Sequence, residues 1–211
     1  MFHQMIEKAV HKSQHCQRNW DLTQEVPEKD LKVMETAITQ CPSKQNYAYY
    51  KPYIITDRKK IEAIYDQTDG FDYNAEGDTV KNVQVLANVL VAFAEDDQYK
   101  TATREDYREL NAIEAVEAGE ELPEQVRQRN ISIGIAAGYL NLSASMMGYS
   151  TGCCTCFDGN KVAEILGTDK PVHLLMGVGI ADESRPRREK HDDPEFVYPT
   201  YKKYLDAVRV A

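Results

Sequence analysis

The sequence predicts a single α+β domain over residues 1–211, with a central mixed sheet flanked by helices and one long buried helix. Three observations predict this fold class. The chain has 211 residues, which is enough for one hydrophobic core and short of what two cores need. Helical and strand patterns follow in the order α, α, β, α, β, α, α, β, without the regular alternation or the G-x-G-x-x-G motif of a Rossmann domain. Residues 124–147 form one apolar stretch of helical length.

The first part of the chain predicts helices around one short strand. Apolar residues at helical spacing indicate an amphipathic helix that opens the chain and ends near residue 11. A second helix begins at Pro27, since proline is favoured at the first helical position and acidic residues fill the first turn. It ends at Pro42. Residues 52–56 then predict a strand, and residues 58–66 predict a helix before a loop rich in Gly, Asp and Asn.

The later part of the chain contains the continuous apolar runs. Residues 89–94 and 172–180 predict strands that are buried on both faces. Residues 95–122 are polar and acidic, with a predicted helix near their centre, and indicate a surface excursion to which we assign no chemistry. Asp158 is positioned to cap a short helix that Gly167 ends.

The predicted helix over residues 124–147 is apolar around most of its circumference. A helix of this kind is buried on most sides, either in the core or against a second subunit. A single domain of this size cannot easily cover it, so the sequence predicts a homodimer. Its apolar and small side chains are Ile131, Ile133, Ile135, Ala136, Leu140, Leu142, Ala144, Met146 and Met147.

Composition narrows the class of protein. Hydrophobic residues make up 42% and charged residues 28%, which is typical of a folded globular chain. The formal net charge is -9 and the pI is near 5.1, so a positive face for nucleic acid is not expected. The sequence has no apolar run long enough for a membrane span, and its first residues lack a signal-peptide core. We expect a cytoplasmic protein.

The cysteines do not form a disulfide framework. The chain has 5, an odd number, and most of them lie in the run from Cys153 to Cys156. Cys153 and Cys156 form one C-x-x-C pair, but no second pair follows, so a metal or iron–sulfur site stays a minor alternative. Packing of small apolar side chains in a buried turn is the favoured interpretation.

Four local motifs carry a family resemblance. They are the segment Gln14–Trp20, the turn Cys41–Asn46, the turn Gly152–Asp158, and the terminal strand with Gly177-Val178-Gly179 followed by Pro186-Arg187-Arg188. In this order they resemble the nitroreductase family of FMN enzymes, from about His11 to Arg188. The resemblance implies a mainly antiparallel sheet.

The resemblance also implies which residues hold FMN. Arg18, with Arg187 or Arg188, is expected at the phosphate, because the arginine fork binds two oxygens at once. Gln14 and Cys16 stand where the family usually has arginine and serine. The turn through Asn46 is expected at the ring edge and ribityl chain, and backbone N–H groups of Thr155 and Cys156 at flavin N5. The full implied cofactor-binding set is Gln14, His15, Cys16, Arg18, Pro42, Ser43, Lys44, Asn46, Cys153, Cys154, Thr155, Cys156, Arg187 and Arg188.

The function implied is that of an FMN-dependent oxidoreductase with ping-pong kinetics. Hydride passes from NAD(P)H through flavin N5 to a quinone, a nitroaromatic or free flavin, and no side-chain acid or base is required. The family also implies a homodimer with FMN at the subunit interface. Two alternatives stay open: an FMN-binding or storage protein without turnover, and a specialised member such as a dehalogenase or a flavin-fragmenting enzyme. Aromatic side chains that could stack on a flat acceptor are Tyr47, Tyr49, Tyr50, Phe71 and Tyr73.

Overall fold

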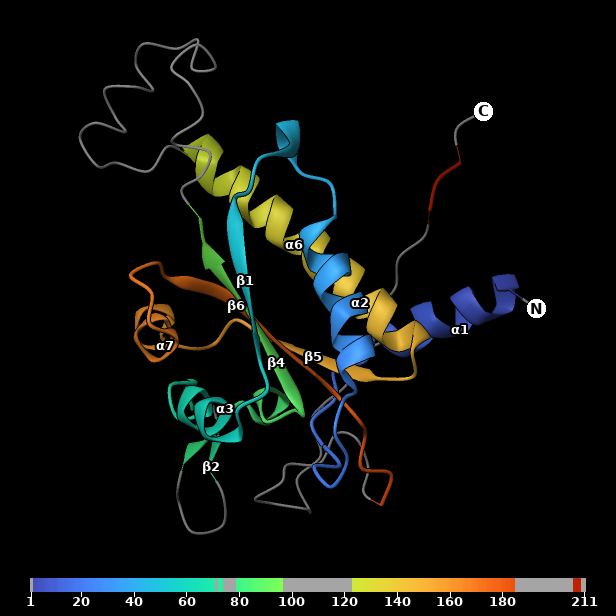
Figure 1. The fold of residues 1–211 in the computed structure, drawn as a ribbon, viewed down its shortest axis with the longest axis horizontal. Helices are drawn as coiled ribbons and strands as arrows, with labels where there is room; N and C mark the ends of the chain where they lie inside the picture. Colours follow the sequence, from blue (N-terminus) through green and yellow to red (C-terminus); the bar gives the residue numbers. More distant parts are fainter. Residues whose placement is uncertain (1, 71, 74–78, 97–122, 185–206, 210–211) are drawn as a thin grey trace.

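A 4-stranded antiparallel sheet forms the centre of the protein (Figure 1). The computed structural model describes residues 2–70, 72–73, 79–96, 123–184 and 207–209. The strands are ordered β1 (Tyr50–Ile55), β4 (Val89–Glu95), β6 (Val172–Gly179) and β5 (Ser150–Cys154). Each neighbouring pair is antiparallel. The predicted α+β class and the mainly antiparallel sheet are confirmed.

Helices cover both faces of this sheet (Figure 1). On one face, Val91 and Phe93 of β4 belong to a core cluster that includes α2 (Glu28–Thr39) and α6 (Pro123–Met146). On the other face, Leu90 and Ala92 pack with α3 (Arg58–Tyr65) and α7 (Gly159–Leu166). Successive strand residues point to opposite faces. The continuous apolar run of β4 is therefore what a strand between two helical layers requires.

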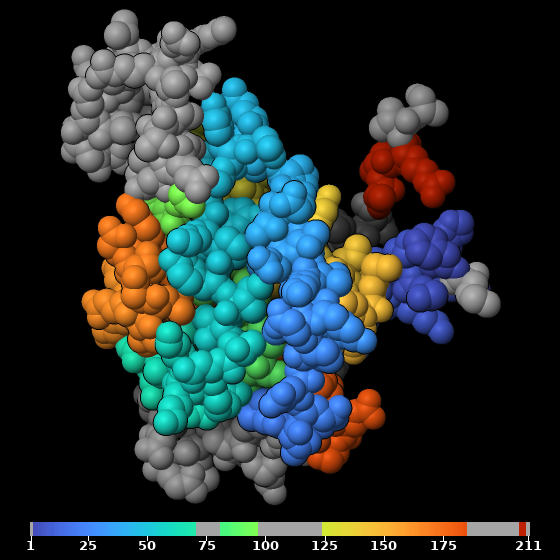
Figure 2. All heavy atoms as spheres, viewed as in Figure 1, coloured from blue at the N-terminus to red at the C-terminus, as the bar shows by residue number. Residues whose placement is uncertain are grey.

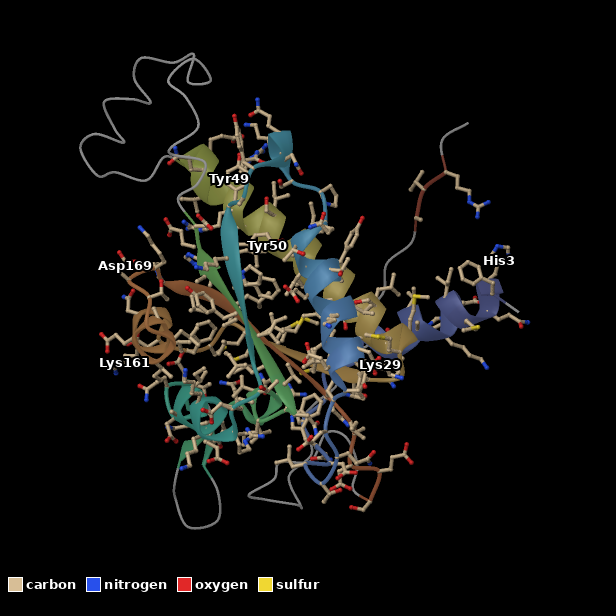
Figure 3. All side chains as sticks on the ribbon, viewed as in Figure 1. His3, Lys29, Tyr49, Tyr50, Lys161 and Asp169 are labelled. Atoms are coloured by element: carbon tan, nitrogen blue, oxygen red, sulfur yellow. The ribbon has the colours of Figure 1, made fainter. Side chains whose placement is uncertain are left out.

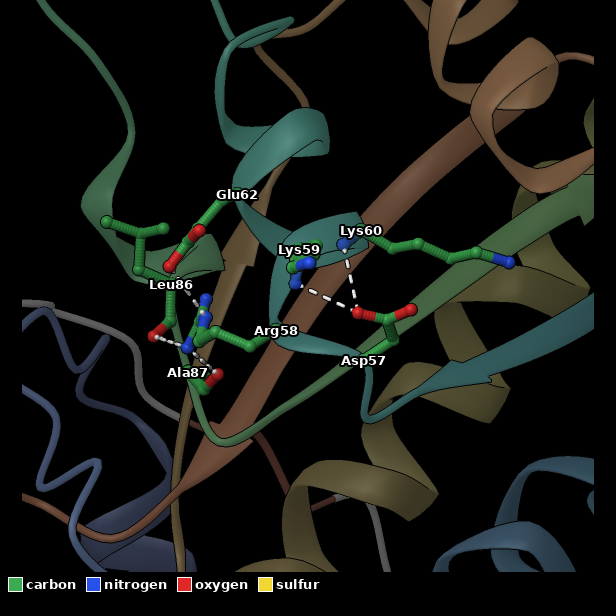
Figure 4. Close-up of polar contacts among 7 residues, drawn as sticks. All are labelled: Asp57, Arg58, Lys59, Lys60, Glu62, Leu86 and Ala87. Atoms are coloured by element: carbon green, nitrogen blue, oxygen red, sulfur yellow. Dashed lines mark hydrogen bonds and ion pairs between the residues drawn. The ribbon is translucent and has the colours of Figure 1, made fainter.

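Local capping signals fix two of the helices. The Asp57 carboxylate accepts hydrogen bonds from the backbone N–H groups of Lys59 and Lys60 at the start of α3 (Figure 4). Asp158 caps α7 in the same way, as predicted. Gly167 then ends α7 with φ 73°, a left-handed conformation that glycine adopts without strain.

Among the described residues, the long helix α6 is covered on only one side. Its inner face, including Ala136, Leu140 and Ala144, is fully buried. On the outer face Ile131 and Tyr139 are 45% and 49% exposed. The described residues therefore bury one side of this helix, whereas the prediction was burial on most sides. The apolar residues of the other side are exposed in the single chain that the structure describes.

Helix α1 (Phe2–Ser13) extends away from the sheet at one end of the molecule (Figures 1 and 2). Ala9 is its one buried residue. The large apolar side chains Phe2, Met5 and Val10 are at least half exposed. Folded proteins rarely leave such side chains together in water, so this helix is a second apolar surface that the described residues do not cover.

The largest departure from the sequence prediction is β5. We expected residues 152–158 to be a turn, but Ser150–Cys154 forms an edge strand, and the turn begins only after it. These residues form a strand because they pair with β6, which lies further along the chain. The local pattern of small residues does not reveal such a pairing. The predicted helix around residues 107–117 lies outside the described residues. Within the described part of the chain, no helix has the length and hydropathy of a membrane span.

Candidate functional site

The first and third motifs lie side by side along the edge of β5. Cys16 forms a parallel bridge with Thr151, and the Gln17 backbone N–H donates to Thr151 O at 2.8 Å. A Cβ atom added at Gly152 would lie 2.7 Å from Gln17 O and 3.2 Å from the Cys16 sulfur. Only glycine permits this approach, because a side chain there would clash with backbone. The structure thus joins two segments that are far apart in the sequence.

A short 3-10 helix, η2 (Val83–Val85), closes the same region from the other side. Gln84 Nε2 donates to Cys153 O at 3.4 Å and to Asn82 Oδ1 at 3.1 Å. Asn82 Nδ2 donates to Cys156 O at 3.3 Å. Sequence reasoning missed both amides. The available signal was a glutamine between two valines, Val83 and Val85, a short distance before a buried strand.

Most residues around the end of β5 reach the surface. Cys153, Thr155 and Cys156 are exposed, while Cys154 is buried. Cys156 O also accepts from the Asp69 backbone N–H at 2.9 Å, so the turn is anchored at both ends. The favoured interpretation of packing cysteines in a buried turn therefore holds for Cys154 alone.

The thiols of Cys153 and Cys154 keep their protons at neutral pH. Desolvation by burial raises the pKa of Cys154 to about 12. Desolvation, followed by the neighbouring Cys16 thiol, raises the pKa of Cys153 to about 11. Cys153 reaches solvent, which limits its shift, so the buried Cys154 carries the stronger argument. Protonated thiols are poor nucleophiles and metal ligands, and no cluster of three or more possible metal ligands occurs among the described residues.

The remaining residues of the first motif divide between the surface and the core, and Asn19 and Trp20 are buried. Gln14 and His15 are exposed, and Arg18 is half-buried. Gln14 Nε2 donates to His11 O at 3.0 Å. A cavity of about 290 Å³ adjoins this segment and is lined by Lys12, His15, Gln17, Ser150, Ala181, Asp182 and Glu183. The predicted phosphate contacts Arg187 and Arg188 lie outside the described residues.

The second motif lies at the opposite end of α6. Pro42, Lys44 and Asn46 are exposed, and Lys44 pairs with Glu124 in the first turn of α6 at 3.2 Å. The first motif instead adjoins the other end of that helix, where Asn141 Nδ2 donates to Ser13 O at 2.9 Å. These 24 residues of helix span ~36 Å. Figure 1 shows the two ends well separated. One chain therefore does not bring the second motif to the other two.

The turn of the second motif carries backbone strain. Gln45 and Asn46 have φ angles of 54° and 60°, in the left-handed region that non-glycine residues rarely adopt. Ser43 Oγ donates to Tyr47 O at 2.7 Å and holds the turn together. Strain of about 1–3 kcal/mol per such residue is typical of ligand-binding turns.

The tyrosines near this turn belong partly to the core. Tyr49 and Tyr50 lie at the start of β1 (Figure 3). Tyr49 is 5% exposed. The Tyr50 hydroxyl donates to Ile38 O, and its ring packs edge-on against Phe93 at 5.6 Å between centroids. These two are therefore not free to stack on an acceptor. Phe71 and the side chain of Tyr73 lie outside the described part.

Fold and site together define an α+β protein with a surface turn that is braced from two sides and a second, strained turn far from it. The nitroreductase family model matches residues 12–181. The chain belongs to the nitroreductase family. Comparison with curated proteins finds no match.

Solved structures share this fold at low sequence identity. A nitroreductase family protein of Streptococcus pneumoniae is 19% identical, with a TM-score of 0.63 over 99% of this chain and 100% of that one. A protein of Exiguobacterium sibiricum, described as a nitroreductase and solved with FMN, is 17% identical, with a TM-score of 0.64 over 94% and 93% of the chains. A Staphylococcus epidermidis protein described as an NAD(P)H:FMN oxidoreductase is 17% identical, with a TM-score of 0.61 over 95% of each chain.

Proposed function

We propose that this protein is an FMN-dependent oxidoreductase that passes hydride from NAD(P)H to a small acceptor such as a quinone, a nitroaromatic or free flavin. Family membership supports the flavin, as does the FMN complex of the Exiguobacterium protein. The observation that carries the proposal is the convergence of the first motif, the turn after β5 and η2 along one edge of the sheet.

The residues at this edge fit a flavin. Gln84 Oε1 is a buried acceptor with no hydrogen-bond partner among the described residues. A buried acceptor without a donor costs about 1–3 kcal/mol, which a ring N–H of a bound cofactor would offset. Gly152 has no side chain, which lets the first motif and Gln84 pack closely against β5. Arg18 supplies a guanidinium in an acidic chain, where an anionic phosphate needs one.

The residues of this chain bind and orient, and none acts as an acid or base in the proposal. Bound FMN would supply the hydride-accepting and hydride-donating centre at N5. Arg18, with Arg187 or Arg188, would hold the phosphate. The backbone N–H groups of Thr155 and Cys156 would face the ring edge and orient it. Protonated cysteine thiols in the same turn would not compete for electrophilic acceptors.

We further propose a homodimer with FMN at the subunit interface. The strained turn at Gln45 and Asn46 and the edge at Cys16 lie at opposite ends of α6 in one chain. A two-fold axis across the middle of α6 would set the helices antiparallel and bring each turn to the other chain's edge. Each flavin would then contact both chains.

The outer face of α6 supports this arrangement. Ile131, Tyr139 and Met146 are exposed there, and added Cβ atoms at Gly134 and Gly138 would meet nothing within 4 Å. A glycine inside a helix costs about 1 kcal/mol relative to alanine. Nothing in the described chain offsets that cost, whereas close approach of a second α6 would. An obligate interface of this kind buries more than about 2,000 Å² in total.

Spectroscopy and sedimentation test the proposal. We expect purified protein to bind FMN as a dimer and to lose its visible flavin absorbance when NADH or NADPH is added without oxygen. FMN bound without reduction by either nicotinamide would instead indicate a flavin-binding protein. Absence of FMN binding would refute the flavin assignment. A monomer at micromolar concentration that still holds FMN would refute the shared site.

A further inference from the structure

We propose that Asn82 and Gln84 are positioning residues that clamp the turn after β5 and thereby fix its backbone N–H groups for the flavin. The inference rests on the proposed function in one respect, namely that this turn faces FMN. The clamp itself is a property of the chain without any ligand.

The two amides hold the two ends of one turn. Gln84 Nε2 donates to Cys153 O, where the turn leaves β5, and also to Asn82 Oδ1. Asn82 Nδ2 donates to Cys156 O and to Asp69 O, at 3.3 and 3.0 Å. Because the amides are also bonded to each other, both ends of the turn are held by one connected unit. The residues between those ends, including Thr155, carry the N–H groups that would face the ring.

The backbone that carries Asn82 and Gln84 is held in place by other parts of the chain. Trp20 Nε1 donates to Val83 O at 3.2 Å, at the start of η2. Arg58 Nη1 donates to Leu86 O and Ala87 O at 3.1 and 3.0 Å, just after η2 (Figure 4). A Cβ added at Gly177 would lie 2.2 Å from Gln84 O, so β6 packs directly against the backbone of the clamp. The backbone of η2 therefore has little freedom to move, and its side chains transmit that rigidity to the turn.

Burial indicates that this polar unit serves more than packing. Asn82 and Gln84 are 7% and 5% exposed. Burial of an amide is unfavourable unless its hydrogen bonds are satisfied, and Gln84 Oε1 has no partner among the described residues. An apolar side chain of similar volume would avoid that cost. The glutamine is explained if its donor group positions the turn and its acceptor meets a bound ligand.

Exchange in FMN-free protein tests the clamp. Gln84→Met keeps the volume and removes the donor. We expect backbone hydrogen exchange over residues 153–158 to become about tenfold faster, with exchange in α2 unchanged. Asn88→Leu is the matched control. Asn88 makes three hydrogen bonds, to Asp21 O, Gln24 O and the Ile180 N–H, which hold a different loop. That control should destabilise the fold without accelerating exchange at the turn.

The flavin then tests what the clamp positions. At saturating FMN, we expect Gln84→Met to alter the visible circular dichroism of the bound flavin and to weaken FMN binding about tenfold, while Asn88→Leu leaves the spectrum unchanged. Asn82→Leu should behave like Gln84→Met and serves if the first variant does not fold. Unchanged exchange at the turn in both variants would overturn the clamp. Faster exchange with an unchanged flavin spectrum would overturn its role toward the flavin. If neither the natural chain nor any variant binds FMN, the proposed function is refuted. The hydrogen-exchange result then decides by itself whether the clamp exists.

Discussion

Gly134 and Gly138 lie near the middle of α6 on the face that the described residues leave exposed. Their replacement by alanine should give opposite results for two arrangements of the protein. An added Cβ at either position meets nothing within 4 Å in the part of a single chain that the structure describes. If that face remains in solvent, each alanine only improves helix propensity. If a second α6 crosses there, each methyl group enters the space between two backbones.

The magnitudes separate the two cases. In an exposed helix, two Gly→Ala changes should raise the free energy of unfolding by about 2 kcal/mol in total. At a close crossing, an added methyl group costs about 1–3 kcal/mol through overpacking. A two-fold interface contains each substitution twice, so Gly138→Ala should weaken the dimer by about 2–6 kcal/mol. At 1.4 kcal/mol per decade, the dimer dissociation constant should rise between about 30-fold and about 10⁴-fold.

Sedimentation equilibrium with and without FMN measures the effect, and urea unfolding measures stability in parallel. We expect the double variant to dissociate at concentrations where the natural chain is dimeric, and to release FMN as it does so. Thr36→Ala, on the exposed side of α2, is the control for helix propensity, because it should stabilise slightly and leave the dimer intact. A double variant that is more stable than the natural chain and equally dimeric would refute the crossing at these glycines.

Three further predictions concern the site and its surroundings. Replacement of Arg18 and Arg188 together by alanine should cost about 1.5–3 kcal/mol of FMN affinity for each charged bond lost, and fluorescence titration that gives the natural affinity would contradict the phosphate assignment. Tyr149 donates to the Asp30 carboxylate at 2.6 Å, and burial followed by that hydrogen bond raises the pKa of Tyr149 to about 12. Because the pKa of Tyr149 is higher in the folded than in the unfolded protein, where it is about 10, its protonated hydroxyl stabilises the fold below pH ~10, and this contribution is lost as the pH rises toward 12. Tyr149→Phe should therefore lower the free energy of unfolding by about 1 kcal/mol at neutral pH. Urea unfolding should show the difference from the natural chain shrinking between about pH 10 and about pH 12. A constant difference across that range would argue against the bond. Replacement of Cys153, Cys154 and Cys156 together by serine or alanine should leave the flavin spectrum in place, with only a modest loss of stability. Loss of a stoichiometric metal in that variant would instead show that these cysteines are metal ligands.

Much of the fold could be predicted because its signals are local. The apolar run at residues 89–94 can satisfy its burial only as a strand covered on both faces, and β4 is that strand. Asp158 and Gly167 bracket α7 as predicted, since a cap acts on the backbone within a turn of itself. Boundaries shifted by two residues at the end of α1 and the start of β1, where pairing and packing extend the elements beyond their local signals.

The arrangement of the candidate site followed in part from the sequence, while its role toward FMN stays a prediction. The segment at Cys16 and the turn after β5 were singled out from motifs, and the structure brings them together. The turn at Asn46 was singled out too, yet it lies at the far end of α6 in the same chain. Asn82 and Gln84 were missed, because an amide that bonds a carbonyl some 70 residues away leaves no periodic trace in the sequence.

The sequence by itself determined the main helices and three of the four strands of the central sheet, the acidic charge, and the family motifs, all of which depend on neighbouring residues or on composition. Only the tertiary structure decided that Ser150–Cys154 is an edge strand, that η2 braces the turn, and that the described residues leave one face of α6 uncovered. The physical reason is that hydrophobic periodicity indicates which side chains are buried but not which part of the protein buries them. An apolar helix side can meet its own core or another subunit, and the sequence pattern is the same in both cases.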